Sequence, residues 1–144
     1  MPHLVILYSG NLDARTDMSV LCRRLADTML AQRDEAGQPV FPPGGTRVFA
    51  YPAAHFAVSD GGAAGRAAGS NAEYGFAYLN LRMGRGRSEA VQQGVGRALM
   101  AEAKAHFEPL MVAMHLGVTL QIDVGAEVFD AKHSTLHPLF NKPD

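Results

Sequence analysis

The segment from residue 74 to residue 99, YGFAYLNLRMGRGRSEAVQQGVGRAL, holds a strand signal, a turn signal and a helix start in one run. Tyr74 to Arg82 alternates between leucines on one face and aromatic residues on the other, which is typical of a β-strand. Gly84 to Arg87 predicts a turn, and the Ser88 hydroxyl is placed to cap the helix that follows. The apolar positions of that helix are Val91, Val95 and Leu99. The segment therefore predicts strand, turn and helix in that order.

The rest of the second half completes a strand–helix–strand unit. The helical pattern continues through Phe107, Leu110 and Met114, and Pro109 inside it is expected to kink or shorten the helix. Gly117 to Val124 then predicts a closing strand.

The first half shows the same order of elements. His3 to Tyr8 predicts a strand, about Asp13 to Arg33 an amphipathic helix, and Thr46 to Tyr51 a second strand after a Pro/Gly-rich turn. The apolar stripe of the helix consists of Met18, Leu21, Cys22, Leu25 and Met29, so Cys22 is expected to belong to the core.

These elements predict one domain over residues 1–144, of the α/β (α+β) class. It contains a first β-α-β unit at about 2–58, a flexible Gly/Ala-rich loop at 61–72, a second unit at about 74–124 and a C-terminal segment at 125–144. Tandem units of this kind predict a four-stranded sheet with two helices on one face. The other face also carries apolar side chains that nothing in the chain can cover, so we expect an oligomer.

Composition narrows the function classes. A net charge of −1 argues against a dedicated nucleic-acid binder, and a single cysteine excludes a disulfide framework. The histidines lack metal-ligand spacing, so no metal site is expected. Residues 1–10 do not resemble a secretory signal, and no apolar run is long enough to span a bilayer. These features predict a soluble cytoplasmic protein with no membrane association.

Pro2 is the first candidate for chemistry. Removal of Met1 is expected before a small residue such as proline, and it would expose a secondary amine at Pro2. Burial and nearby arginines both lower the pKa of such an amine, which makes it a reasonable general base near neutral pH. A proline at this position also arises by chance about one time in twenty.

Three arginines are the next candidates. Arg47 follows a Gly-Gly turn, and Arg85 and Arg87 flank Gly86 just before the second helix. Guanidinium groups bind carboxylates in bidentate fashion, and a helix N-terminus also favours anions. The turn therefore predicts either an anion site or an ordinary solvated turn, and residue types alone leave both open.

Taken in order along the chain, five short motifs resemble the tautomerase superfamily, and within it the 5-carboxymethyl-2-hydroxymuconate Δ-isomerase family. The motifs are Pro2-His3, the turn Phe41 to Arg47, Gly84 to Ser88, His106-Phe107 and His137 to Phe140. The resemblance covers most of the chain. The Gly/Ala-rich loop 61–72 departs from the family pattern as an insertion.

The resemblance implies a trimeric, cofactor-independent isomerase that acts on an unsaturated dicarboxylate or tricarboxylate in aromatic-compound catabolism, such as homoprotocatechuate degradation. Pro2 would be the general acid/base that moves a proton from the enol oxygen to a carbon, converting 5-carboxymethyl-2-hydroxymuconate to its 2-oxo isomer. Arg47 and Arg87 would bind substrate carboxylates, with Arg85 as an additional candidate. Two alternatives remain: another tautomerase reaction on a simpler 2-hydroxydienoate, or a non-catalytic trimer of the same fold.

Overall fold

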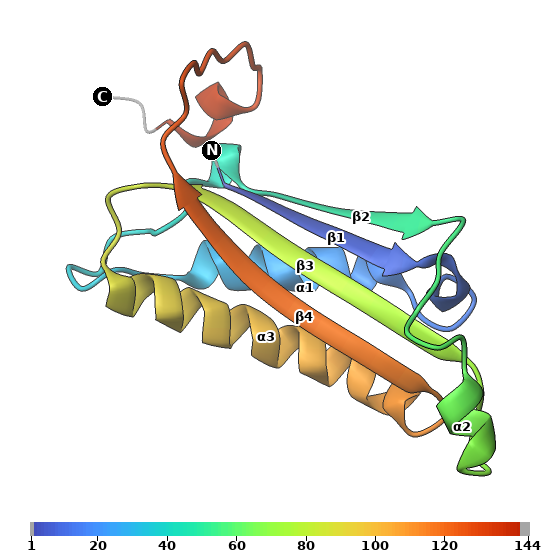
Figure 1. The fold of residues 1–144 in the computed structure, drawn as a ribbon. Coiled ribbons are helices and arrows are strands. Elements are labelled where there is room, and N and C mark those ends of the chain that lie inside the picture. The colour runs from blue at the N-terminus through green and yellow to red at the C-terminus, as the bar shows by residue number, and fades with distance from the viewer. Residues whose placement is uncertain (1, 142–144) are drawn as a thin grey trace.

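The computed structural model describes residues 2–141, in which two long helices cover one face of a four-stranded sheet (Figure 1). Met1, and residues 142–144 of the predicted C-terminal segment, lie outside the described residues. The main elements are β1 (His3–Ser9), α1 (Met18–Ala31), β2 (Arg47–Ala53), β3 (Tyr74–Gly84), α3 (Glu89–Met111) and β4 (His115–Gly125). Shorter elements are α2 (Ala63–Ala67) and the 3-10 turns η1 (Gly10–Leu12), η2 (Pro43–Gly45) and η3 (His137–Phe140). The two predicted β-α-β units and the fold class are confirmed.

The strand order is β2-β1-β3-β4, and each β-α-β unit contributes one parallel pair. The units meet through β1 and β3, which run antiparallel in the centre of the sheet. In this register His3 lies opposite Arg47 on one side and opposite Arg82 on the other. The starts of β1 and β2 therefore share one edge of the sheet with the ends of β3 and β4.

The core lies between the sheet and the two helices. Its fully buried side chains come from alternate positions of β1 and β3 and from the apolar stripes of α1 and α3. They include Leu4, Ile6, Leu21, Leu25, Met29, Leu79, Leu81, Leu99 and Phe107. Cys22 is half-buried against this core, and burial raises the pKa of its thiol. The stripes predicted from the sequence are thus the ones that the fold buries.

Both long helices differ slightly from expectation at their ends. The first begins at Met18 rather than near residue 13, because the Asp17 carboxylate accepts hydrogen bonds from the backbone N–H groups of Ser19 (2.8 Å) and Val20 (3.3 Å). The second runs through Pro109 and ends two residues later, at Met111. The helix therefore continues past Pro109 and ends three residues before Met114, the last apolar position of the predicted pattern.

The segment 61–72, predicted as a flexible loop, contains the short helix α2 (Ala63–Ala67) and is therefore not loop throughout. The Asp60 carboxylate accepts hydrogen bonds from the N–H groups of Gly62, Ala63 and Ala64, and these bonds hold the pKa of Asp60 below its ordinary value. The Tyr74 hydroxyl accepts a bond from the N–H of Gly65 at 3.0 Å. The hydrogen bonds to Asp60 and to Tyr74 of β3 therefore stabilise a helix in a stretch that has few large apolar side chains for a core.

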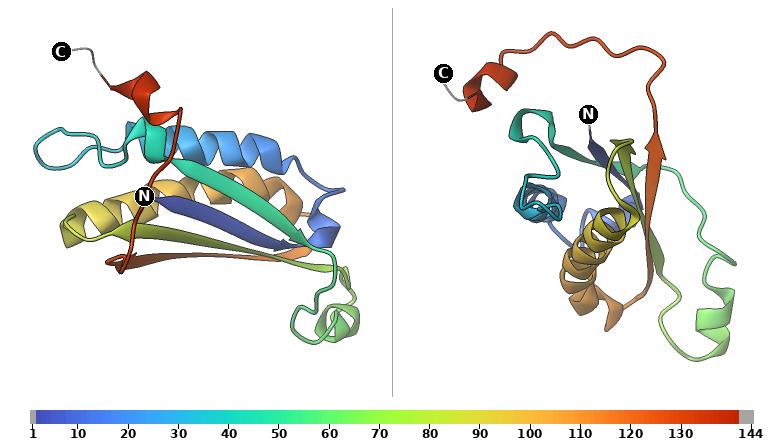
Figure 2. Two further views of the ribbon diagram at one scale, coloured as in Figure 1. Left: turned by 90° about the horizontal axis from the view of Figure 1, so that it is seen from above. Right: turned by 90° about the vertical axis from the view of Figure 1, so that its left-hand side faces the viewer.

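The face of the sheet opposite the helices is open in the single chain (Figure 2). Alternate residues of the strands point to this side, and several are large and apolar. Their exposed fractions are 50% for Leu7, 45% for Phe49, 51% for Tyr51 and 37% for Phe76. The uncovered apolar face predicted from the sequence is present. None of the helices in the described part of the chain is long and apolar enough to cross a membrane.

Candidate active site

Most of the predicted site residues lie at the edge of the sheet where β1 and β2 begin, which we call the Pro2 edge. Pro2 directly precedes β1, and Arg47 opens β2. The turn that holds Arg85 and Arg87 follows β3 at the same edge, because β3 runs antiparallel to β1. The C-terminal segment leaves β4 at this edge and crosses above the N-terminus (Figures 1 and 2).

Pro2 is buried, and its neighbour His3 shows the electrostatic character of the site. Burial lowers the pKa of His3, and nearby positive charges, including those of Arg47 and Arg82, lower it further. Pro2 directly precedes His3, so its nitrogen lies near the same positive charges.

Arg47 is half-buried and lines a cavity of about 390 Å³ whose other walls come from the C-terminal segment. The turn η2 places it there, and the Thr46 hydroxyl closes that turn by donating to the carbonyl of Pro42 at 3.0 Å. Gly44 lies against η3, and a Cβ at this glycine would come within 3.1 Å of the Cα of His137. Close packing of η2 on η3 thus fixes both Arg47 and the segment above it.

Arg87 makes contacts that differ from those expected of a ligand-binding arginine. Its Nε and Nη2 atoms donate to the carbonyl of Val40 at 3.2 and 2.7 Å, and its Nη1 atom donates to the carbonyl of Gly84 at 3.1 Å. Its guanidinium carbon also lies 5.5 Å from the centre of the Phe41 ring. These contacts tie the turn after β3 to the segment before η2.

The N-terminus of α3, predicted as a possible anion site, faces a carboxylate of the chain itself. The Ser88 hydroxyl accepts from the N–H of Val91 at 3.2 Å and donates to Glu35. This hydrogen bond lowers the pKa of the Glu35 carboxyl group. Arg85 is exposed in the same turn, where Gly86 adopts a φ of +108°.

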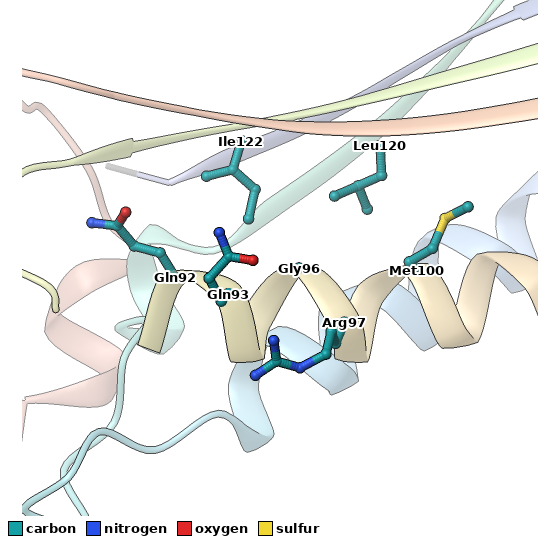
Figure 3. Close-up of a pocket in the computed structure, with 7 residues that line it drawn as sticks. All are labelled: Gln92, Gln93, Gly96, Arg97, Met100, Leu120 and Ile122. Carbon is teal, nitrogen blue, oxygen red and sulfur yellow. The ribbon is translucent and has the colours of Figure 1, made fainter. Parts of the chain in front are cut away.

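Another cavity, of about 450 Å³, lies between α3 and the edge strand β4 (Figure 3). Its lining residues are Gln92, Gln93, Gly96, Arg97, Met100, Leu120 and Ile122. None of the predicted site residues lines it. Among residues 2–141 there is also no cluster of histidine, cysteine and acidic side chains that could hold a metal ion.

Comparisons with a family model, with curated proteins and with solved structures all find the same family. The family model described as 5-carboxymethyl-2-hydroxymuconate isomerase matches residues 2–140. This chain belongs to that family. A crystal structure of a 5-carboxymethyl-2-hydroxymuconate delta-isomerase is 62% identical, with a TM-score of 0.96 over 100% of this chain and 95% of that one.

More distant relatives in the isomerase family cover nearly the whole chain as well. The isomerase from Deinococcus radiodurans R1 is 28% identical, with a TM-score of 0.78 over 98% of this chain and 95% of its own. The Δ-isomerase of Escherichia coli is 25% identical over 97% of this chain and 99% of its own length. The family resemblance inferred from the five motifs is confirmed.

Within this isomerase fold, the five motifs divide into two groups. Four of them lie around the Pro2 edge, where the turn before Arg47 packs on the His137–Phe140 turn. The His106-Phe107 motif lies elsewhere and is structural. Phe107 is fully buried, and Nε2 of His106 shares a hydrogen bond of 2.8 Å with the hydroxyl of Thr16.

Arg82 is the residue near Pro2 that the sequence analysis missed. It is exposed at the end of β3, opposite His3. In the alternating pattern of Tyr74 to Arg82, Arg82 lies on the same face as the aromatic residues. This position in the pattern was the sequence signal that could have indicated it as a site residue. Its closeness to Pro2 depends on the pairing of β1 with β3.

We predict that Arg87→Ala destabilises the fold by about 1–3 kcal/mol, because carbonyl groups of Val40 and Gly84 lose charged donors. Urea denaturation at a fixed protein concentration measures this change. Arg85→Ala is the matched control, and its exposed side chain should change stability by less than about 0.5 kcal/mol. Equal stability of both variants would show that the hydrogen bonds of Arg87 do not stabilise the fold.

Proposed function

We propose that this chain isomerises 5-carboxymethyl-2-hydroxymuconate to its 2-oxo form, with the amine of Pro2 as general acid/base. The observation that supports this most is the family match over residues 2–140, together with a buried Pro2 whose neighbour His3 pairs with Arg47. The reaction moves one proton within the substrate and changes no oxidation state. The proposed transfer uses the amine alone.

The first step in this proposal is removal of the enol proton at the 2-hydroxyl group. The unprotonated amine of Pro2 accepts that proton while negative charge spreads over the dienolate. Burial and the positive charges that act on His3 keep a useful fraction of the amine unprotonated near neutral pH. The protonated amine then delivers the same proton to a carbon of the dienolate, which completes the tautomerisation.

The arginines have different roles in the proposal. Arg47 lines the cavity next to the Pro2 edge, so its guanidinium binds a substrate carboxylate and stabilises the dienolate. Arg82 contributes positive charge from the other side of His3. Arg87 supports the site by holding the turn after β3 against Val40. Its N–H groups that do not bond the carbonyls of Val40 and Gly84 are the ones that bind a substrate carboxylate in this proposal.

The open face of the sheet supports assembly of the chain as a homotrimer. Leu7, Phe49, Tyr51 and Phe76 are all exposed on this face, and exposed apolar side chains gathered on one face mark an interaction surface. Packing of sheet faces against other copies would remove this surface from water. The Pro2 edge borders the same sheet, so assembly would also shape the site.

The proline hypothesis predicts that Pro2→Ala lowers kcat/KM by about 100-fold or more, the usual contribution of a positioned acid/base. The decay of the dienol chromophore in the ultraviolet measures the rate. Intact mass must first show that Met1 is absent, since a Pro2 amide nitrogen has no basicity. Protein that retains Met1 is the matched control and should be inactive. A fully active Pro2→Ala enzyme would refute the mechanism.

Charge near the amine predicts a shift of the pH profile. Removing a nearby cation raises the pKa of the Pro2 amine, so Arg82→Gln moves the acidic limb of kcat/KM upward by about 0.5 pH unit. Arg82→Lys keeps the charge and should leave the limb in place. A limb that stays fixed in both variants would show that Arg82 does not act on the base.

A charged side chain placed on the open sheet face tests whether the chain assembles through that face. Size-exclusion chromatography with light scattering should give three times the 15.4 kDa chain mass for the unmodified protein. Leu7→Lys, on the open face, should yield a smaller species. Val20→Lys is the matched control, because Val20 is 47% exposed on α1 and lies away from the sheet face. Dissociation by both variants or by neither would contradict this interface.

A further inference from the structure

The C-terminal segment, residues 126–141, forms a bridge across the Pro2 edge of the sheet (Figures 1 and 2). It leaves the end of β4 and comes down on η2, where His137 and Phe140 pack against Gly44. Because η2 directly precedes Arg47, this packing brings the middle of the segment over the Arg47 side chain. The segment thus forms a wall beside the proposed active site.

The cavity enclosed by this wall has a distinct chemical character. Its polar lining side chains are Arg47, Lys132, His133, Ser134, Thr135 and His137. Every one of them is basic or a neutral hydrogen-bonding group, and no carboxylate lines the cavity. The nearest acid in sequence is Asp130, whose carboxylate pairs with the Lys132 ammonium at 2.5 Å. Such a lining favours an anion.

Local hydrogen bonds give the wall a defined shape. The Ser134 hydroxyl accepts from the backbone N–H groups of Leu136 at 3.0 Å and His137 at 3.4 Å, which fixes the turn into η3. Nδ1 of His137 is buried and has no hydrogen-bond partner among the described residues. The His137 ring therefore has unused hydrogen-bonding capacity in the wall of the cavity.

We propose that Lys132 and His133, together with Arg47, form a subsite for a carboxylate of the substrate, on the C-terminal segment. This inference rests on the proposed function. A 5-carboxymethyl-2-hydroxymuconate molecule carries one carboxylate more than 2-hydroxymuconate, on its carboxymethyl arm. The subsite receives this extra carboxylate and so sets the preference for the tricarboxylate.

Kinetics on two substrates test the subsite. The Lys132→Ala/His133→Ala double variant should raise KM for 5-carboxymethyl-2-hydroxymuconate about fivefold to tenfold, with kcat little changed. Its KM for 2-hydroxymuconate should stay within about twofold. Lys104→Ala, an exposed lysine on α3, is the control and should change neither value. Equal effects on both substrates, or none, would overturn the proposal.

A variant that is expected to lower KM, rather than raise it, gives a second test of the subsite. Asp130→Asn removes the carboxylate that pairs with Lys132, so it should lower KM for the tricarboxylate by about twofold and leave the dicarboxylate unchanged. An increase of KM for the tricarboxylate in this variant would contradict a role of Lys132 in binding that anion.

Calorimetry with unreactive acids separates the subsite from the reaction. Propane-1,2,3-tricarboxylate should bind the unmodified protein more tightly than glutarate, and the double variant should lose that preference. If this preference is present but neither dienol reacts, the subsite stands and the proposed isomerisation fails. If the dienols react but the preference is absent, the isomerisation stands and the subsite is wrong.

Discussion

The antiparallel pairing of β1 with β3 is the contact on which the rest of the molecule depends. Each β-α-β unit alone would end in two exposed strand edges, and this pairing joins the units into one sheet. It also brings the starts of one parallel pair to the ends of the other. As a result, a proline at the beginning of the chain lies beside an arginine from the end of β3. Both helices cover the same face, so the opposite face is exposed in the single chain.

The turn after β3 holds two distant parts of the chain together. Ser88 begins α3 and anchors Glu35, while Arg87 holds the carbonyls of Val40 and Gly84. These contacts join the segment before η2 to the second unit. The position of Arg47 depends on that segment, since η2 leads directly into β2. The guanidinium group of Arg87 therefore stabilises the segment that leads to Arg47.

Periodicity predicted the four strands and the two long helices, because their apolar residues face a single core. It could not predict α2, whose order comes from the Asp60 cap and from a hydroxyl group on β3. Pro2 and Arg47 were predicted as site candidates from chemistry and resemblance, and their roles stay predictions. Arg82 was missed because only strand pairing places it next to His3. The backbone partners of Arg87 also depend on contacts between distant segments, which residue types do not encode.

The bridge formed by the C-terminal segment has a consequence for local stability. Between Gly125 and η3 most of its side chains are exposed, including Val128 and Phe129, and its attachment to the body is concentrated where η3 meets Gly44. A segment with so few buried contacts opens at a much lower free-energy cost than the sheet beneath it. The amide hydrogens of residues 126–136 will then exchange with solvent far faster than those of β1 and β3. Such a local opening leaves the register of the four strands unchanged.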